Sequence, residues 1–73
     1  MGSAIVDDIK WVDANYEDLH RKFAGKYIVV KNGKVVIVAD DFSTADRRAR
    51  EVLKPGTEYI IERIEHGDLY AYF

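Results

Sequence analysis

The sequence predicts a small α+β domain, a two-layer α-β-β-α-β-β sandwich in which two helices cover one face of a mostly antiparallel four-stranded sheet. Three observations predict it. Two β-branched runs flank an Asn-Gly pair, apolar residues recur at helical spacing before and after this hairpin, and β-forming residues fill the C-terminal part. The 73 residues suffice for one domain, assigned to residues 1–73.

The first helix is predicted to begin at Asp13 or Asn15, both good N-cap residues, and to end at Gly25. The preceding residues 1–10 are expected to be frayed or to form a short extra strand. The apolar stripe of this helix consists of Val12, Tyr16, Leu19 and Phe23.

The β-hairpin is the strongest local signal in the chain. Residues 26–31 and 34–39 flank Asn32-Gly33, a pair suited to a two-residue turn because both turn positions need positive φ. This turn predicts the register Lys31 opposite Lys34, Val30 opposite Val35 and Ile28 opposite Ile37.

A second helix is predicted after Asp40-Asp41, with Ser43 as its N-cap and a stop at Pro55. Residues 57–64 are predicted to form a third strand. Residues 68–73 are predicted to form a fourth strand after a His66-Gly67 turn, and the expected strand order is 2-1-3-4.

Both faces of this predicted sheet are apolar. If both helices cover one face, the other is left with four tyrosines and four aliphatic residues, which is typical of an interaction surface. We therefore predict a binding surface, the Tyr/Val face, formed by Tyr27, Val29, Val36, Val38, Tyr59, Ile61, Tyr70 and Tyr72. The alternatives are that terminal segments cover this face, or that a register slip of one residue exchanges the two faces.

No catalytic or metal-binding constellation is visible in the sequence. His20 and His66 have no second ligand at metal-binding spacing, and we interpret them as a boundary residue and a turn residue. Asp40, Asp41 and Asp46 are interpreted as strand terminators and caps, since no nucleophile or base accompanies them. Arg47, Arg48 and Arg50 alternate with acidic residues, which favours a solvated helix face. We predict no enzyme activity, no cofactor and no metal.

Composition limits the classes of partner. The net charge of −2 and pI near 5.6 disfavour a nucleic-acid binder, which usually carries a basic excess. The longest apolar run is five residues, Val35 to Ala39, which predicts no membrane span, and no signal-peptide pattern is present, so a cytoplasmic location is expected. The chain lacks Cys and Gln and has two Asn, a composition that suggests a thermophile.

A resemblance rests on four motifs in order. They are Asn15-Tyr16-Glu17-Asp18-Leu19, the run from Phe23 through Gly25-Lys26-Tyr27 to Val30, Asn32-Gly33-Lys34-Val35-Val36, and Asp40-Asp41 before a helix. Over residues 11–53 the chain resembles a family of small prokaryotic proteins, common in archaea, catalogued as a domain of unknown function. The resemblance implies no activity, catalytic residue or cofactor, and its members look like stand-alone companions of other genes.

These observations lead to two hypotheses about function. The first is a non-enzymatic interaction module that forms a homodimer, or binds another protein, through the Tyr/Val face. The alternative is single-stranded nucleic-acid binding, in which the tyrosines of the same face would stack on bases.

Overall fold

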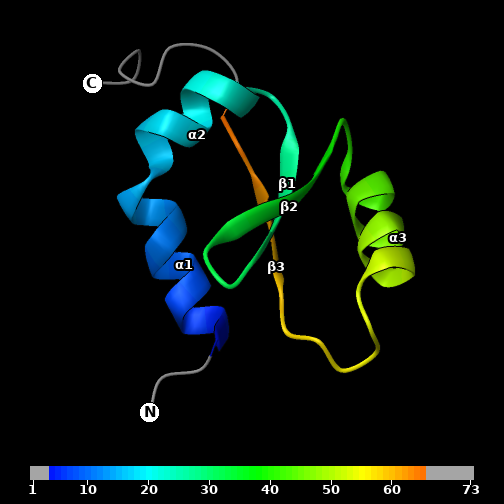
Figure 1. Ribbon diagram of the computed structural model, residues 1–73. Helices are drawn as coiled ribbons and strands as arrows, with labels where there is room; N and C mark the ends of the chain where they lie inside the picture. The colour runs from blue at the N-terminus through cyan, green and yellow to red at the C-terminus, as the bar shows by residue number, and fades with distance from the viewer. Residues whose placement is uncertain (1–3, 66–73) are drawn as a thin grey trace.

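The computed structural model describes residues 4–65, which form three helices and a three-stranded antiparallel sheet (Figure 1). The order of strands is β2-β1-β3, as predicted for these three strands. The fourth strand predicted for residues 68–73 lies outside the described residues. The elements are α1 (Ala4–Ala14), α2 (Tyr16–Phe23), β1 (Tyr27–Lys31), β2 (Lys34–Ala39), α3 (Phe42–Val52) and β3 (Ile60–Arg63).

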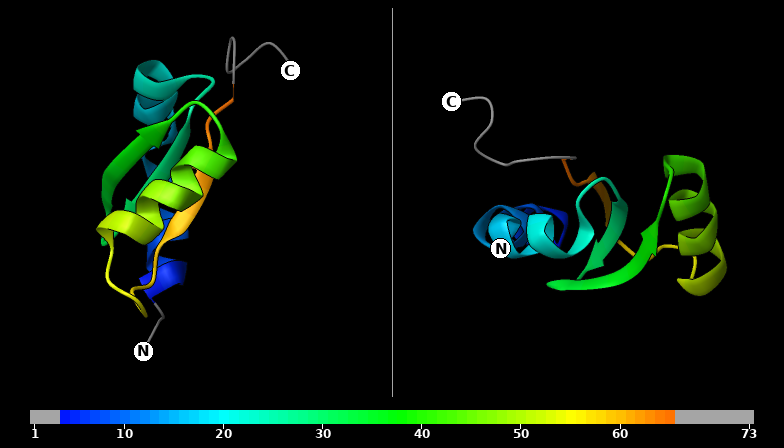
Figure 2. Two further views of the ribbon diagram at one scale, coloured as in Figure 1. Left: turned by 90° about the vertical axis from the view of Figure 1, so that its right-hand side faces the viewer. Right: turned by 90° about the horizontal axis from the view of Figure 1, so that it is seen from above.

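The helices lie on both faces of the sheet. Figure 2 shows α1 and α2 on one side and α3 on the other. The predicted two-layer sandwich with a four-stranded sheet and both helices on one face is therefore wrong, whereas the α+β class is confirmed. The physical reason is in the strands themselves, since near-continuous apolar runs are typical of strands covered on both sides.

Residues 4–14 form a helix, so the predicted frayed segment or short strand is wrong there. Val12 is 3% exposed on the inner side of α1. The helical conformation is interrupted at Asn15, between α1 and α2. The Nδ2 of Asn15 donates a hydrogen bond to the Trp11 carbonyl at 2.8 Å, and the side chain does not cap α2. The predicted first helix therefore corresponds to α2, and its expected apolar stripe is divided between two helices.

The hairpin turn is confirmed, since Asn32 and Gly33 have φ of +53° and +69°. Lys31 pairs with Lys34 and Val30 with Val35, as predicted. The register then shifts at a β-bulge in β2, so Ile28 lies opposite Val38 rather than opposite Ile37. This one extra residue moves Ile37 to the α3 face of the sheet and Val38 to the α1–α2 face.

The helix α3 begins at Phe42, and its N-cap is Asp41 rather than the predicted Ser43. The Asp41 carboxylate accepts a hydrogen bond from the Thr44 backbone N–H at 2.7 Å. Ala45 and Ala49 on α3 are fully buried, and their small side chains let this helix lie close to the sheet.

The sheet separates two apolar clusters. The α1–α2 cluster is built on Val12, Leu19, Ile28, Val30 and Ile64, with Trp11, Tyr16, Phe23, Val35, Val38 and Ile60 packed against it. The α3 cluster is built on Val29, Ile37, Ala39, Ala45 and Ala49, with Tyr27, Leu53, Tyr59 and Ile61 packed against it.

Candidate interaction site

Half of the predicted Tyr/Val face lies beneath α3. Val29 has no exposed surface, and Tyr27, Tyr59 and Ile61 are only half-buried members of the α3 cluster. Tyr27 also packs edge-on against Phe42, with ring centroids 6.1 Å apart. The premise that one face of the sheet is open is wrong, because α3 covers this face.

The other four residues of the predicted face lie elsewhere. Val38 packs into the α1–α2 cluster, and Val36, at the bulge, is 40% exposed. Tyr70 and Tyr72 lie outside the described residues. The structure therefore does not bring the eight residues together as one open surface.

The outer edge of β2 is the candidate site that the structure offers instead. In the described sheet β2 pairs only with β1, so the backbone groups along its other side have no strand partner within residues 4–65. Lys34 and Val36 on this strand are exposed, and Val38 is half-buried. An unpaired edge of six residues is a natural template for another strand.

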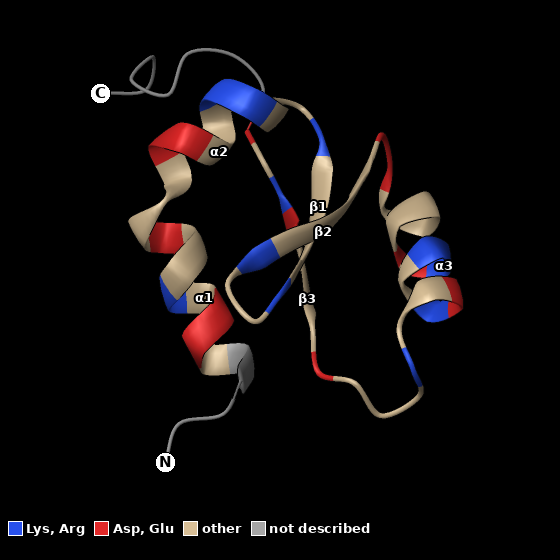
Figure 3. Ribbon diagram, viewed as in Figure 1, with Lys and Arg blue, Asp and Glu red and all other residues tan. Residues whose placement is uncertain are grey.

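The two ends of β2 carry opposite charges (Figure 3). At the hairpin end, Lys31 and Lys34 face each other across the turn, and neither forms an ion pair within the described part of the chain. Like charges directly opposite each other in a sheet are unfavourable. At the other end, β2 runs into Asp40 and Asp41, and the Asp40 carboxylate pairs with the Lys26 ammonium.

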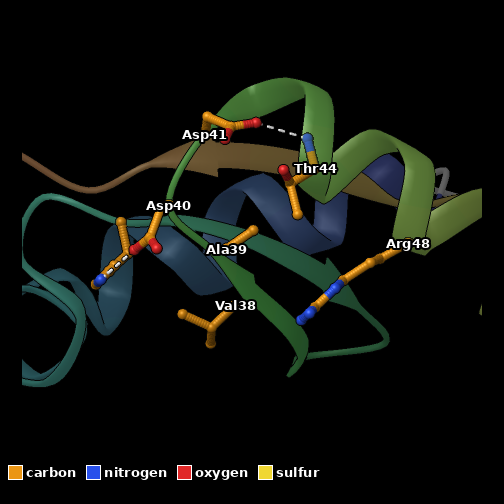
Figure 4. A pocket seen from close by; sticks show the side chains of 7 residues that line it. Val38, Ala39, Asp40, Asp41, Thr44 and Arg48 are labelled. Carbon is orange, nitrogen blue, oxygen red and sulfur yellow. Dashed lines mark hydrogen bonds and ion pairs between the residues drawn. The ribbon is translucent and has the colours of Figure 1, made fainter.

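A shallow cavity of about 230 Å³ lies where β2 meets α3 (Figure 4). Thr44 and Arg48 line it from α3, and Val38, Ala39, Asp40 and Asp41 line it from the end of β2 and the following turn; Lys26 completes the lining. Arg48 is exposed and has no ion-pair partner among residues 4–65. The lining therefore holds two cationic and two anionic side chains, and one of the cations lacks a carboxylate partner.

The Asp41 carboxylate at this cavity has a lowered pKa. The hydrogen bond from the Thr44 backbone N–H is the main cause, the Thr44 side chain is the next, and the positive charge of Arg47 makes a smaller contribution in the same direction. Asp41 thereby occupies the N-terminus of α3 with its own charge, and that helix end is not a vacant anion site.

The described residues hold no group of three His, Asp or Glu side chains placed to bind a metal ion. His20 stacks on Tyr16, with ring centroids 6.5 Å apart, and its buried Nε2 has no hydrogen-bond partner among residues 4–65. His66 lies outside the described residues. Arg50 pairs with Asp46 at 3.1 Å, as expected for a solvated helix face.

Asp8 has a structural role that the sequence analysis missed. It is 2% exposed, and its two carboxylate oxygens accept hydrogen bonds from the backbone N–H groups of Asn32 (3.3 Å) and Gly33 (2.9 Å). A Cβ on Gly33 would lie 3.4 Å from Cδ1 of Trp11, so the α1 side chains close over the turn. The available signal was an acidic residue four positions before Val12 on one helical face.

Residues 18–67 match the family described as "Family of unknown function (DUF5678)", a span of more than half of the 73-residue chain. The resemblance to a domain of unknown function is thus confirmed, and the match extends beyond residue 53, where the resembling motifs end. An archaeal origin and the individual motifs stay predictions. No curated protein and no solved structure matches the chain. Within residues 4–65 no helix is both long and apolar enough to cross a membrane.

Proposed function

Because the chain belongs to a family of unknown function (DUF5678), its role has to be inferred from its own geometry, and we propose that it is a non-enzymatic module that associates with a second copy of itself through an uncovered sheet edge. The observation that carries this proposal is the outer side of β2, which has no strand partner within residues 4–65. A cytoplasmic location and a thermophilic archaeal source stay predictions of the sequence.

The small core is a second reason to expect association. A single domain of this size supplies a net stability of only about 3–5 kcal/mol from its core. Five aliphatic or aromatic side chains of the described residues are also exposed, including Val36 at 40% and Val52 at 68%. Association buries apolar surface and stabilises the folded chain by mass action.

Self-association through the Tyr/Val face is not the form of the proposal that we retain. Tyr27, Val29 and Ile61 pack in the α3 cluster, and exposing them would require α3 to leave the sheet. The same packing weakens the alternative of single-stranded nucleic-acid binding, which needs tyrosines free to stack on bases. Tyr27 and Tyr59 already pack against α3 and its cluster.

Sedimentation equilibrium over a hundredfold range of concentration tests the proposal. We expect an average mass that rises from 8.4 kDa towards twice that value as concentration increases. A mass that stays at the monomer value throughout would contradict self-association. A parallel titration with a mixed-sequence oligonucleotide at low salt separates the nucleic-acid alternative, since even non-specific binders reach a Kd of about 10⁻⁴ M.

A further inference from the structure

We propose that the two copies pair antiparallel through β2, so that the lysine-bearing start of one strand lies beside the acidic end of the other. Lys34 of one copy then meets Asp40 and Asp41 of the partner copy, and the two-fold axis passes near Ile37 and Val38. This inference rests on the proposed self-association and names its surface and orientation. The result is one continuous sheet through both copies.

The choice of β2 over β3 follows from their lengths and surroundings. β2 has six residues and β3 has four, so β2 offers more backbone groups to a partner strand. The edge of β2 also carries opposite charges at its two ends, with Lys34 at its start and Asp40 just after its last residue.

The charges of β2 select the antiparallel orientation. A parallel pairing would place Lys34 beside Lys34 and Asp40 beside Asp40, and each contact would be repulsive. An antiparallel pairing joins the opposite charges twice, once on each side of the two-fold axis. It also gives a counter-charge to Lys34, which faces Lys31 without one in the described residues.

Because β2 has a bulge at Val36, we expect its pairing with a second copy to depend on side-chain contacts as well as on backbone hydrogen bonds. A bulged edge twists away from flat pairing and resists indiscriminate strand addition. Association there depends on the complementary ends and on burial of Val36, rather than on the backbone alone. The bulge breaks the alternation of side chains along β2. We therefore expect the Lys34 ammonium to interact with both Asp40 and Asp41 of the partner copy rather than with one of these carboxylates.

Arg48 provides a test of this arrangement in which a substitution should strengthen the dimer. It lines the same cavity as Asp40 and Asp41, which the Lys34 ammonium of the partner copy would enter. Lys26 and Arg48 already line this cavity, so the incoming Lys34 ammonium would be a third cation. Lys26 is paired with Asp40, whereas Arg48 has no ion-pair partner among the described residues, so the charge of Arg48 opposes the association. Removing its charge should therefore tighten the dimer, an outcome opposite to that of most interface substitutions.

The test is a charge exchange measured by sedimentation and native mass spectrometry. Lys34→Asp and Asp40→Lys should each raise the dimer Kd about tenfold, because each change turns two attractive contacts into repulsive ones. An equimolar mixture of the two variants should form heterodimers with a Kd within about threefold of the parent. Circular dichroism establishes that each variant is folded before mixing.

Lys10→Asp is the matched control, since it makes the same charge change at an exposed position on α1. We expect it to change Kd less than about twofold. Arg48→Gln should lower Kd by about twofold to threefold. Hydrogen exchange should show protection that rises with concentration in residues 34–39 and not in residues 60–63.

The outcomes separate the two proposals. A parent protein that stays monomeric would overturn both. Three outcomes would overturn the β2 pairing and leave self-association standing. The dimer Kd would be unchanged in Lys34→Asp and Asp40→Lys, the two variants would not form heterodimers, or the concentration-dependent protection would lie in residues 60–63. A weaker dimer in Arg48→Gln would likewise contradict entry of Lys34 into this cavity.

Discussion

The two faces of the sheet are covered in different ways, although both are apolar. On the α1–α2 face, large side chains such as Ile28 and Leu19 fill the space, and the buried Asp8 joins the helix to the hairpin turn. On the α3 face, Ala45 and Ala49 let a single helix approach closely. Packing of large apolar side chains and a buried hydrogen-bonded carboxylate stabilise the α1–α2 face. Close approach of a helix through small residues stabilises the α3 face.

The largest expected effect comes from truncating neighbouring residues of β1 that point to opposite faces. Ile28→Ala should lower the free energy of unfolding by about 3–4 kcal/mol, and Val29→Ala by about 2 kcal/mol. Both side chains are fully buried, so the difference reports the larger volume removed on the α1–α2 face. Urea denaturation followed by circular dichroism measures both variants.

Val36→Ala is the control for this pair, because Val36 lies on the same sheet but is 40% exposed. We expect a change below about 0.5 kcal/mol, measured at a concentration where the protein is monomeric. Equal losses for Ile28→Ala and Val29→Ala would show that the α3 face loses more stability per carbon atom removed than the α1–α2 face.

The hairpin was predictable because its determinants are local. Asn32-Gly33 alone specifies a turn with positive φ at both positions, and the strands on either side follow from β-branched residues. The bulge was not predictable in the same way, since no residue type marks it and it depends on how Ile37 packs against α3. The order of the three strands was also predicted.

The coverage of the sheet was mispredicted for an identifiable reason. The runs Tyr27–Val30 and Val35–Ala39 are apolar at every position, which indicates burial on both faces. Strict alternation within the hairpin divides them into a core face and a binding face, and this division is wrong because α3 covers the second face. The helix α1 was missed because its inward side carries Asp8, so its apolar stripe is interrupted by a charge.

Replacing Asp8 tests the buried charge that interrupts the apolar stripe of α1. Asp8→Ala should lower the free energy of unfolding by about 2–3 kcal/mol, because hydrogen bonds to a charged acceptor are strong and the N–H groups of Asn32 and Gly33 would lose theirs. Thermal or urea unfolding measures the loss. Asp13→Ala, at an exposed position on the same helix, should change stability by less than about 0.5 kcal/mol.

A loss in Asp8→Ala no larger than that in Asp13→Ala would mean that the turn forms without its contact to α1. Asp8→Asn sharpens the result, since the amide oxygen can accept one of the two hydrogen bonds. We expect its stability to lie between those of the parent and Asp8→Ala.

The candidate site was less predictable than the fold because it depends on what is left uncovered. The residue types of β2, lysine at its start and aspartate after its end, are visible in the sequence. Their significance follows only from the strand order, which places β2 at an edge, and from the cavity that Arg48 and Asp40 line together. Surface aromatics alone were a poor guide, since Tyr27 and Tyr59 serve the α3 cluster.

The smallest expected effect distinguishes the two aspartates that anchor the two faces. Asp8 is buried and joins separate elements, whereas Asp41 is exposed and caps the helix that follows it. The Thr44 N–H holds the pKa of Asp41 below the ordinary value of 3.8 in the folded protein. The contribution of Asp41 to stability is therefore fully present above the unfolded pKa and is lost as pH falls through the lowered folded pKa.

An NMR titration of the Asp41 carboxyl should give a midpoint below 3.8 in the native protein and a return to about 3.8 in urea, where the cap is absent. Arg47→Gln should raise the native midpoint only slightly, because the backbone hydrogen bond remains. A native midpoint equal to the value in urea would mean that α3 begins without this cap, and the position of α3 would then depend on apolar packing such as that of Ala45 and Ala49.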